Sequence, residues 1–235
     1  TLTGIEVTWH ELDTHTLSEE QKEKLVEYGS ILVGLKHESM LSFLHYWLDV
    51  EKHIFVFITE SMFGTSVLDH IVIGNSVVSE RVLAKWFHSI LFAINFLHTN
   101  PAQIIHCGIN LESIFVKPSS GHAKIIPPLI DPYFLFQGKN SIKLRLSTAP
   151  EMLDHKISPA SDIWSFGIAL LYAVTIIEPY SECTCPNDLI TKLQNCQLPD
   201  CILQVKSPQL LDLINRCLKP ESERPTADAL LKHPF

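Results

Sequence analysis

Apolar and polar residues alternate along the start of the chain in the manner of a β-strand. Ile5, Val7 and Trp9 are separated by polar residues, which predicts a half-buried strand with these three side chains on its apolar face. Two runs rich in aromatic and β-branched residues follow at 41–47 and 54–59. A short charged segment separates the two runs, so we expect them to pair as a β-hairpin.

A helix is expected between the first strand and this hairpin. Ser18 can cap its amino end, and Gln21 stands at the reciprocal position of a capping box. The apolar positions that follow recur at helical spacing, which predicts one buried face made of Leu25, Tyr28, Leu32 and Leu35.

The pattern becomes mainly helical after the segment 60–64, which we interpret as a joint. Apolar residues at helical spacing from Leu83 to Leu97 predict a long buried helix. Two short apolar strands are expected at 113–116 and 123–126. Capping residues and first-turn prolines predict three further helices, over 158–177, 207–218 and 226–233.

These elements predict an α+β, bilobal architecture. A small lobe of strands and one helix spans 1–63 and carries the joint, and a larger, mainly helical lobe spans 64–235.

Charge and composition narrow the range of partners. The chain of 235 residues has 18 Lys and Arg against 26 Asp and Glu, a formal net charge of −8, and no basic cluster. This balance argues against nucleic acid and against an anionic membrane surface as partners. The apolar stretch 163–177 is also shorter than the roughly 20 residues that span a bilayer.

The six cysteines predict a reducing compartment. They are too few for a disulfide scaffold in a chain of this length, so we expect free thiols and a cytoplasmic location. Their spacing within 183–201 lacks the paired C-x2-C of a zinc knuckle, and no metal site is expected. The chain begins without a basic-then-apolar leader, and because it has no initiator Met we expect it to be part of a longer protein.

Three motifs in the second half of the chain have the order and spacing found in protein kinases. They read Ala149-Pro150-Glu151, then Asp162-Ile163-Trp164-Ser165-Phe166-Gly167, then Arg224-Pro225. The chain resembles protein kinases over essentially its whole length. Four further strings resemble the with-no-lysine kinases and especially the nuclear receptor-binding protein pseudokinases, at 4–12, 45–47, 57–60 and 178–183.

The resemblance implies a bilobal kinase fold that this sequence enters at the third strand of the small lobe. The glycine-rich strand pair over the phosphates is expected to precede this sequence. His10 takes the place of the lysine on the third strand. With-no-lysine kinases supply a lysine from the preceding strand, so this replacement leaves activity open. The glutamate that pairs with this lysine in kinases aligns with Tyr28, and Glu27 is the neighbouring residue. This alignment also leaves activity open.

The catalytic loop departs most from an active kinase. Where the family reads His-Arg-Asp-Leu-Lys-x-x-Asn, this chain reads His-Cys-Gly-Ile-Asn-Leu-Glu-Ser over 106–113. By the resemblance, Gly108 replaces the aspartate that accepts the substrate proton, Asn110 replaces the phosphate-stabilising lysine, and Ser113 replaces the metal-binding asparagine. Pro127 stands where the magnesium-binding aspartate is expected.

The segment after Pro127 leaves two alternatives open. Asp131 is a nearby carboxylate, and it would reach the site only by a local rearrangement. Three aromatic residues follow, and they are expected either to anchor a partner protein or to fill the nucleotide space: Tyr133, Phe134 and Phe136. Cys107, expected to be an ordinary thiol, replaces the arginine that pairs with a phosphorylated activation loop, so no switch of that kind is expected.

Residues of the kinase scaffold are retained. By the resemblance, Glu151 and Arg224 form the ion pair that ties the end of the activation segment to the large lobe, and Asp162 orders the backbone of the catalytic loop. We expect His106 to pack beneath that loop and His10 to be a solvent-accessible strand residue.

Because the scaffold residues are retained and the catalytic residues are replaced, the sequence predicts a catalytically inactive pseudokinase domain. It would be no enzyme, take no cofactor, and act on other proteins as a scaffold or allosteric regulator in intracellular signalling. One alternative is a pseudokinase that binds ATP without metal through the hinge residues Glu60, Ser61 and Met62, behind Thr59. The other is an atypical with-no-lysine-like serine/threonine kinase with residual ATP phosphotransfer, rescued by the preceding-strand lysine and Asp131.

Overall fold

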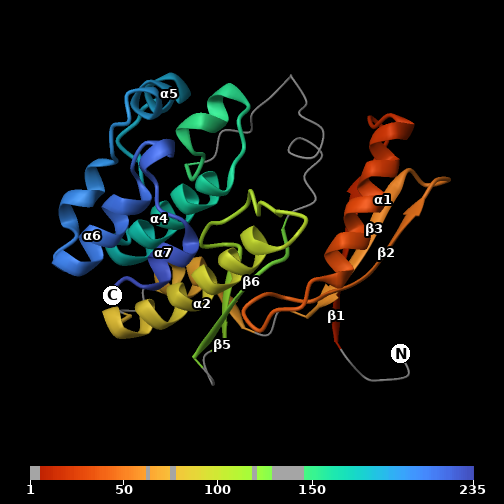
Figure 1. Ribbon diagram of the computed structural model, residues 1–235, viewed down its shortest axis with the longest axis horizontal. Coiled ribbons are helices and arrows are strands. Elements are labelled where there is room, and N and C mark those ends of the chain that lie inside the picture. The colour runs from red at the N-terminus through yellow and green to blue at the C-terminus, as the bar shows by residue number, and fades with distance from the viewer. Residues whose placement is uncertain (1–5, 62–63, 75–77, 118–120, 129–145) are drawn as a thin grey trace.

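The computed structural model describes the chain apart from residues 1–5, 62–63, 75–77, 118–120 and 129–145. A small antiparallel sheet with one helix lies beside a larger, mainly helical part (Figure 1). The predicted α+β class is confirmed. No helix among the described residues has the combination of length and apolar composition needed to cross a membrane.

The first sheet and its helix come from the amino-terminal quarter of the chain. The sheet holds β1 (Val7–Asp13), β3 (Ile54–Glu60) and β2 (Phe43–Asp49) in that order, each antiparallel to its neighbour, and α1 (Glu19–Gly34) packs on β2. A Cβ on Gly29 of α1 would lie 2.8 Å from Tyr46 Cδ2 and 3.1 Å from Phe55 Cζ. Glycine therefore permits the close approach of α1 to the sheet.

The local signals of α1 act as predicted. Ser18 Oγ accepts a hydrogen bond from Gln21 N at 3.3 Å, and Gln21 Oε1 accepts one from Ser18 N at 2.9 Å, which completes the capping box. Leu25 and Leu32 on the predicted stripe are fully buried. The pattern of apolar residues was thus sufficient to identify this helix and its buried face.

The buried face of β1 is the opposite of the one that the alternation suggested. Val7 and Trp9 are 45% and 53% exposed, whereas His10 and Leu12 are half-buried. The physical reason is that both faces of β1 carry large side chains. Trp9 packs edge-on against Trp47 of β2 on the outer face, with ring centroids 4.9 Å apart.

A second small sheet connects the two parts of the molecule. It contains β4 (Thr65–Ser66), β5 (Ile114–Lys117) and β6 (His122–Ile125), all antiparallel. Ile125 O accepts a hydrogen bond from Leu41 N at 2.8 Å, and Ile125 N donates to Ser39 O at 2.9 Å. These two bonds join the segment ahead of β2 directly to β6.

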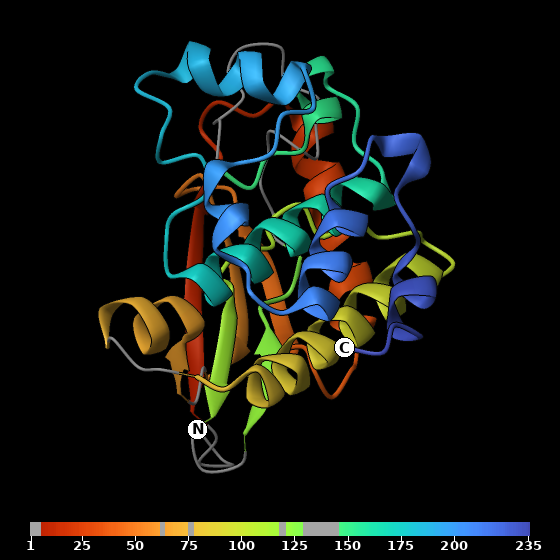
Figure 2. The same cartoon turned by 90° about the vertical axis from the view of Figure 1, so that its left-hand side faces the viewer.

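The larger part is built on two long helices. Its helices are α2 (Glu80–Thr99), α4 (Pro159–Thr175), α5 (Pro186–Gln194), α6 (Pro208–Cys217) and α7 (Ala227–Leu231). Short helical turns are the π-helical η1 (Asp69–Ile73) and the 3₁₀ turns η2 (Pro150–Asp154), η3 (Asp200–Gln204) and η4 (Glu221–Glu223). Helix α2 packs on α4, α7 and β6, and α4 packs on α6 (Figure 2).

Two helical features differ from the expectations. The helix predicted over 158–177 ends at Thr175, because Ile176 adopts a left-handed conformation with a φ of 57°. Helix α5 was not predicted, although Pro186 at its first turn and the buried Leu189 and Leu193 are a readable signal.

Candidate functional site

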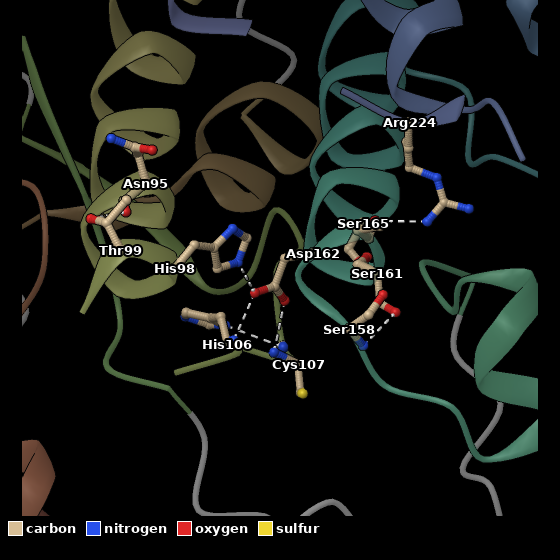
Figure 3. Close-up of polar contacts among 12 residues, drawn as sticks. Asn95, His98, Thr99, His106, Cys107, Ser158, Ser161, Asp162, Ser165 and Arg224 are labelled. Atoms are coloured by element: carbon tan, nitrogen blue, oxygen red, sulfur yellow. Dashed lines mark hydrogen bonds and ion pairs between the residues drawn. The ribbon is translucent and has the colours of Figure 1, made fainter. Parts of the chain in front are cut away.

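The catalytic-loop segment is held by a buried carboxylate at the start of α4. Asp162 is 1% exposed, and it accepts hydrogen bonds from His106 N at 2.7 Å and Cys107 N at 2.9 Å. His98 of α2 places Nε2 2.9 Å from the same carboxylate (Figure 3). Three segments that are distant in the sequence are thereby fixed around one side chain, and the backbone of the loop is positioned.

Residue 162 is positioned in turn by the amino end of α4. Pro159 occupies the first turn, where its missing N–H costs no hydrogen bond. Ser161 Oγ accepts from Ser158 N at 3.3 Å and donates to Glu151 Oε1 at 2.8 Å. These contacts set the first turn of α4 and, with it, the direction of Asp162.

His106 is fully buried beneath the loop. Its Nδ1 accepts a hydrogen bond from Gly108 N at 3.1 Å, so its Nε2 carries the proton that faces Ile126 O at 2.9 Å. Burial lowers the pKa of His106, although Asp162 opposes this effect. The ring is therefore a neutral bridge between the loop and the strand β6 that leads toward Pro127.

Tyr28 of α1 interacts electrostatically with the catalytic-loop segment and its anchor. Burial raises the pKa of Tyr28, and electrostatic interactions with Cys107 and Asp162 raise it further. Cys107 adopts a left-handed backbone conformation with a φ of 56°. The position that the resemblance assigns to a glutamate thus holds a neutral phenol close to the catalytic loop.

Asn110 and Ser113 form a closed hydrogen-bonded turn. Asn110 Oδ1 accepts from Glu112 N at 2.8 Å and Ser113 N at 2.9 Å, and Asn110 Nδ2 donates to Gly108 O at 3.3 Å. Ser113 Oγ donates to Asn110 O at 2.8 Å and accepts from Asn110 N at 3.0 Å. Both side chains are consequently used to hold the loop.

The residues at the expected metal positions do not fit a divalent cation. Ser113 is 3% exposed and its hydroxyl is engaged, while Pro127 is buried and has no ligand oxygen on its side chain. Within the described residues, no group of three His, Cys, Asp or Glu side chains could hold a metal ion. Asp131 lies outside the described residues.

His10 is half-buried, so it is less exposed than the accessible strand residue that was expected. Its ring stacks on Phe57 with centroids 4.5 Å apart, and Nε2 lies 3.1 Å from Thr59 Oγ1. Burial lowers the pKa of His10. The face of β1 that would carry the lysine therefore carries a half-buried, neutral imidazole.

The hinge is braced from the larger part of the molecule. Lys124 Nζ of β6 lies 2.5 Å from Glu60 Oε1 at the end of β3. Ser61 N donates to Glu6 O at 3.2 Å. Met62 lies outside the described residues, as do Tyr133, Phe134 and Phe136.

Glu151 and Arg224 form a buried, two-pronged ion pair. Arg224 places its two terminal nitrogens 2.7 and 3.0 Å from the two Glu151 oxygens, and it also donates to Ala160 O at 2.7 Å. The guanidinium lies 5.2 Å from the ring centroid of Trp164. Burial alone would raise the pKa of Glu151, but hydrogen bonds led by Arg224 outweigh it, and the pKa is lowered.

A pocket of about 590 Å³ lies beside this loop. Gly108, Asn110 and Ser113 line it from the loop, and Tyr172 and Glu178 line it from α4 and the segment that follows. Three of the degenerate catalytic positions therefore share one pocket, whereas His10, Glu60 and Ser61 are not among the described residues that line it. Sequence reasoning gave no role to Tyr172, Lys124 or His98, because these residues meet the site only through long-range packing.

Comparison with known proteins places these features in a family. The family model for the protein kinase domain matches residues 2–235. Serine/threonine-protein kinase WNK4 of Rattus norvegicus is 29% identical over 99% of this chain, and serine/threonine-protein kinase WNK8 of Arabidopsis thaliana is 30% identical over 99%. The chain spans 19% of the first relative and 42% of the second, less than half of each.

The relatives overturn two expectations and confirm two others. The prediction of no enzyme and no cofactor is wrong, because proteins similar along nearly the whole chain are named serine/threonine-protein kinases, and protein kinases use ATP and metal ions. The bilobal kinase fold and the resemblance to with-no-lysine kinases are confirmed. With a family model that covers 2–235 and a catalytic loop anchored by Asp162, the chain belongs to the protein kinase domain family.

Proposed function

We propose that this chain is the kinase domain of an atypical with-no-lysine-like serine/threonine protein kinase, with slow, residual phosphotransfer from ATP. The observation that carries the proposal is the anchored loop. Asp162 holds the backbone of His106 and Cys107, and the pocket beside Gly108 gives a protein substrate access to that loop.

The chemistry of phosphoryl transfer makes residual activity compatible with a site that lacks some of the usual catalytic residues. The transferred group passes through a loose transition state, so positioning and electrostatic stabilisation account for most of the rate. A missing base at Gly108 lowers the rate by the contribution of general-base catalysis, about 10²–10⁴-fold, without removing the other contributions. The described residues offer no group of His, Cys, Asp or Glu side chains that could hold a metal ion.

ATP is the proposed phosphoryl donor, with its adenine against the hinge at Glu60 and Ser61. The ion pair between Lys124 and Glu60 occupies the glutamate side chain and braces the end of β3. Support for nucleotide binding comes from the named activity of the relatives. Other proteins, as substrates, are the proposed partners.

A cytoplasmic location is proposed on the state of the thiols. All six cysteines are free: Cys107, Cys183, Cys185, Cys196, Cys201 and Cys217. Free thiols at this number are typical of a reducing compartment.

Restoring the missing carboxylate tests the proposed activity. In the complete natural protein, Gly108→Asp is expected to raise ATP-dependent phosphorylation of serine or threonine by about 10²-fold, because it returns a base to a loop that is already anchored. The measurement is transfer of label from γ-labelled ATP to a mixture of proteins with magnesium present. Gly108→Asn is the matched control, since it has nearly the same shape and no charge. Equal labelling by the three proteins, or none from any of them, contradicts the proposal.

A further inference from the structure

The segment 35–41, here called the link, joins α1 to β2 and is also bonded to the larger part of the molecule. Ser39 O accepts a hydrogen bond from Ile125 N at 2.9 Å, and Leu41 N donates to Ile125 O at 2.8 Å. Met40 forms an isolated parallel bridge with Ile125. All four residues are buried, so the bonds between the link and β6 are shielded from water.

The imidazole of His37 holds the link by accepting a hydrogen bond. Its Nδ1 lies 3.1 Å from Ser39 N, which donates, so Nε2 carries the ring proton in the neutral tautomer. This bond needs the lone pair on Nδ1, and it is therefore lost when Nδ1 binds a proton.

Two aromatic side chains of α2 lie against the His37 ring. The ring centroid of His37 is 5.2 Å from that of Phe92 and 5.1 Å from that of Phe96. His37 is half-buried in this position, and burial lowers its pKa. The surroundings thus favour the neutral ring, which is the form that accepts the bond from Ser39.

The charged and titratable groups to consider lie on the elements that carry or contact the link: Lys36 and Glu38 in the link itself, His88 one turn before Phe92 on α2, and Lys124 next to Ile125 on β6. The ammonium of Lys124 is paired with Glu60. The negative charge of Glu38 raises the pKa of His37, but burial has the larger effect, and the pKa is lowered.

We propose that His37 is a pH-sensitive switch, which holds the link against β6 when it is neutral and releases the link when it is protonated. A proton on Nδ1 removes the acceptor of Ser39 N, a buried donor that must then move to find another partner. This movement also displaces Ser39 O from Ile125 N, because the donor and the acceptor belong to one residue.

The switch acts on the strand that leads to the catalytic loop. Ile126, the residue after Ile125, donates from its N to Ser113 O at 3.0 Å, and its O faces His106 Nε2 at 2.9 Å. Release of the link therefore loosens the end of β6 and, through it, the support of the loop. The proposal concerns the connection between the two parts of the molecule and does not rest on the proposed phosphotransfer.

Hydrogen exchange followed by mass spectrometry tests the switch in the complete natural protein. Exchange rates are divided by the intrinsic rates at about pH 7.5 and about pH 5.5, which gives protection factors for peptides that contain Ser39 or Ile125. Protection is expected to fall about tenfold at the lower pH, because the released ring binds a proton at the ordinary pKa of 6.5 and the held ring does not. Peptides from α4 are the internal reference and are expected to change less.

His37→Asn is the matched variant. The side-chain oxygen of asparagine accepts a hydrogen bond from the N–H two residues further on and does not titrate, so protection is expected to be equal at both pH values. His88→Asn removes an exposed histidine from α2 and is expected to keep the fall in protection. The same fall in the natural protein and in His37→Asn overturns the proposal, as does the absence of a fall in the natural protein.

A second measurement does not depend on the folding of any variant. Deuterium exchange at Cε1 of His37 in the natural protein gives the pH at which this ring binds its proton. The midpoint is expected below pH 6.5 and at the same pH as the fall in protection of Ser39 and Ile125. A midpoint above 6.5, or one that differs from the midpoint of the fall in protection, overturns the proposal.

Discussion

At the scale of single residues, breaking the buried ion pair of Glu151 and Arg224 is expected to cost far more stability than breaking an exposed pair. Arg224 has a fully buried side chain, and its partner is 6% exposed. Removing the negative charge would leave the buried guanidinium without its counter-charge. We expect Glu151→Gln to lower the free energy of unfolding by about 3–5 kcal/mol, measured by urea denaturation.

A surface ion pair of similar length provides the comparison. Lys232 and Asp228 approach to 2.6 Å, but their side chains are 74% and 60% exposed. Asp228→Asn is expected to change the free energy of unfolding by at most about 1 kcal/mol. Similar losses in the two variants would show that burial does not determine the strength of these pairs.

At the scale of elements, Gly167 sets how closely α4 approaches α6. A Cβ at this position would lie 2.5 Å from Cys217 Cβ and 3.1 Å from Leu218 Cδ2. Helix propensity alone would favour alanine by about 1 kcal/mol. We expect the steric conflict to dominate, so Gly167→Ala lowers the free energy of unfolding by about 1–3 kcal/mol in urea denaturation.

The last residue of α1 is the matched position without that conflict. A Cβ on Gly34 would meet nothing within 4 Å. Gly34→Ala is expected to raise the free energy of unfolding by about 0.4–1 kcal/mol, because alanine reduces the conformational entropy of the unfolded chain. A gain in stability from both substitutions would contradict the close contact between α4 and α6.

At the scale of the whole molecule, histidines that are partly or fully buried make stability depend on pH. Burial lowers the pKa of His10, His37 and His106 from the ordinary value of 6.5. The unfolded chain binds protons at these rings as the pH falls below about 6.5, while the folded rings stay neutral. Stability is therefore expected to be constant above this pH and to decrease below it, measured as the urea midpoint from about pH 8 to 5.5.

One variant distinguishes the contribution of a histidine to this pH dependence from the contribution of the rest of the chain. His10→Gln removes one of the three rings from a half-buried site, so the midpoint is expected to fall less steeply with pH than in the natural protein. A midpoint that rises as the pH falls would show that the folded state binds these protons more readily than the unfolded chain.

The sequence was sufficient to predict some elements and insufficient for others, and the reasons are physical. Helix α1 was predictable with its cap and buried stripe, because the bonds of Ser18 and Gln21 join residues only three apart. The buried face of β1 was predicted wrongly, because alternation shows that two faces exist but not which one meets α1 and the core. Helix α5 was overlooked although its signal is local, with Pro186 in its first turn.

The candidate site was likewise predictable only in part from the sequence. The kinase motifs identified the family and pointed to Gly108, Asn110 and Ser113 from residue types and spacing alone. Sequence did not show that Asn110 and Ser113 satisfy each other's hydrogen bonds, or that His10 is half-buried beside Thr59. It also overestimated what the lost residues imply, since the relatives are named kinases.

The sequence by itself determined the class of fold, most of its elements, the family and the degenerate positions of the catalytic loop. These follow from periodicity, capping and motif spacing, which act over a few residues or are carried by residue identity. Only the tertiary structure decided that Glu112, Tyr172 and Glu178 meet in one pocket and that Lys124 braces Glu60. Such contacts join residues far apart in the chain, and they depend on how the elements pack rather than on any local pattern.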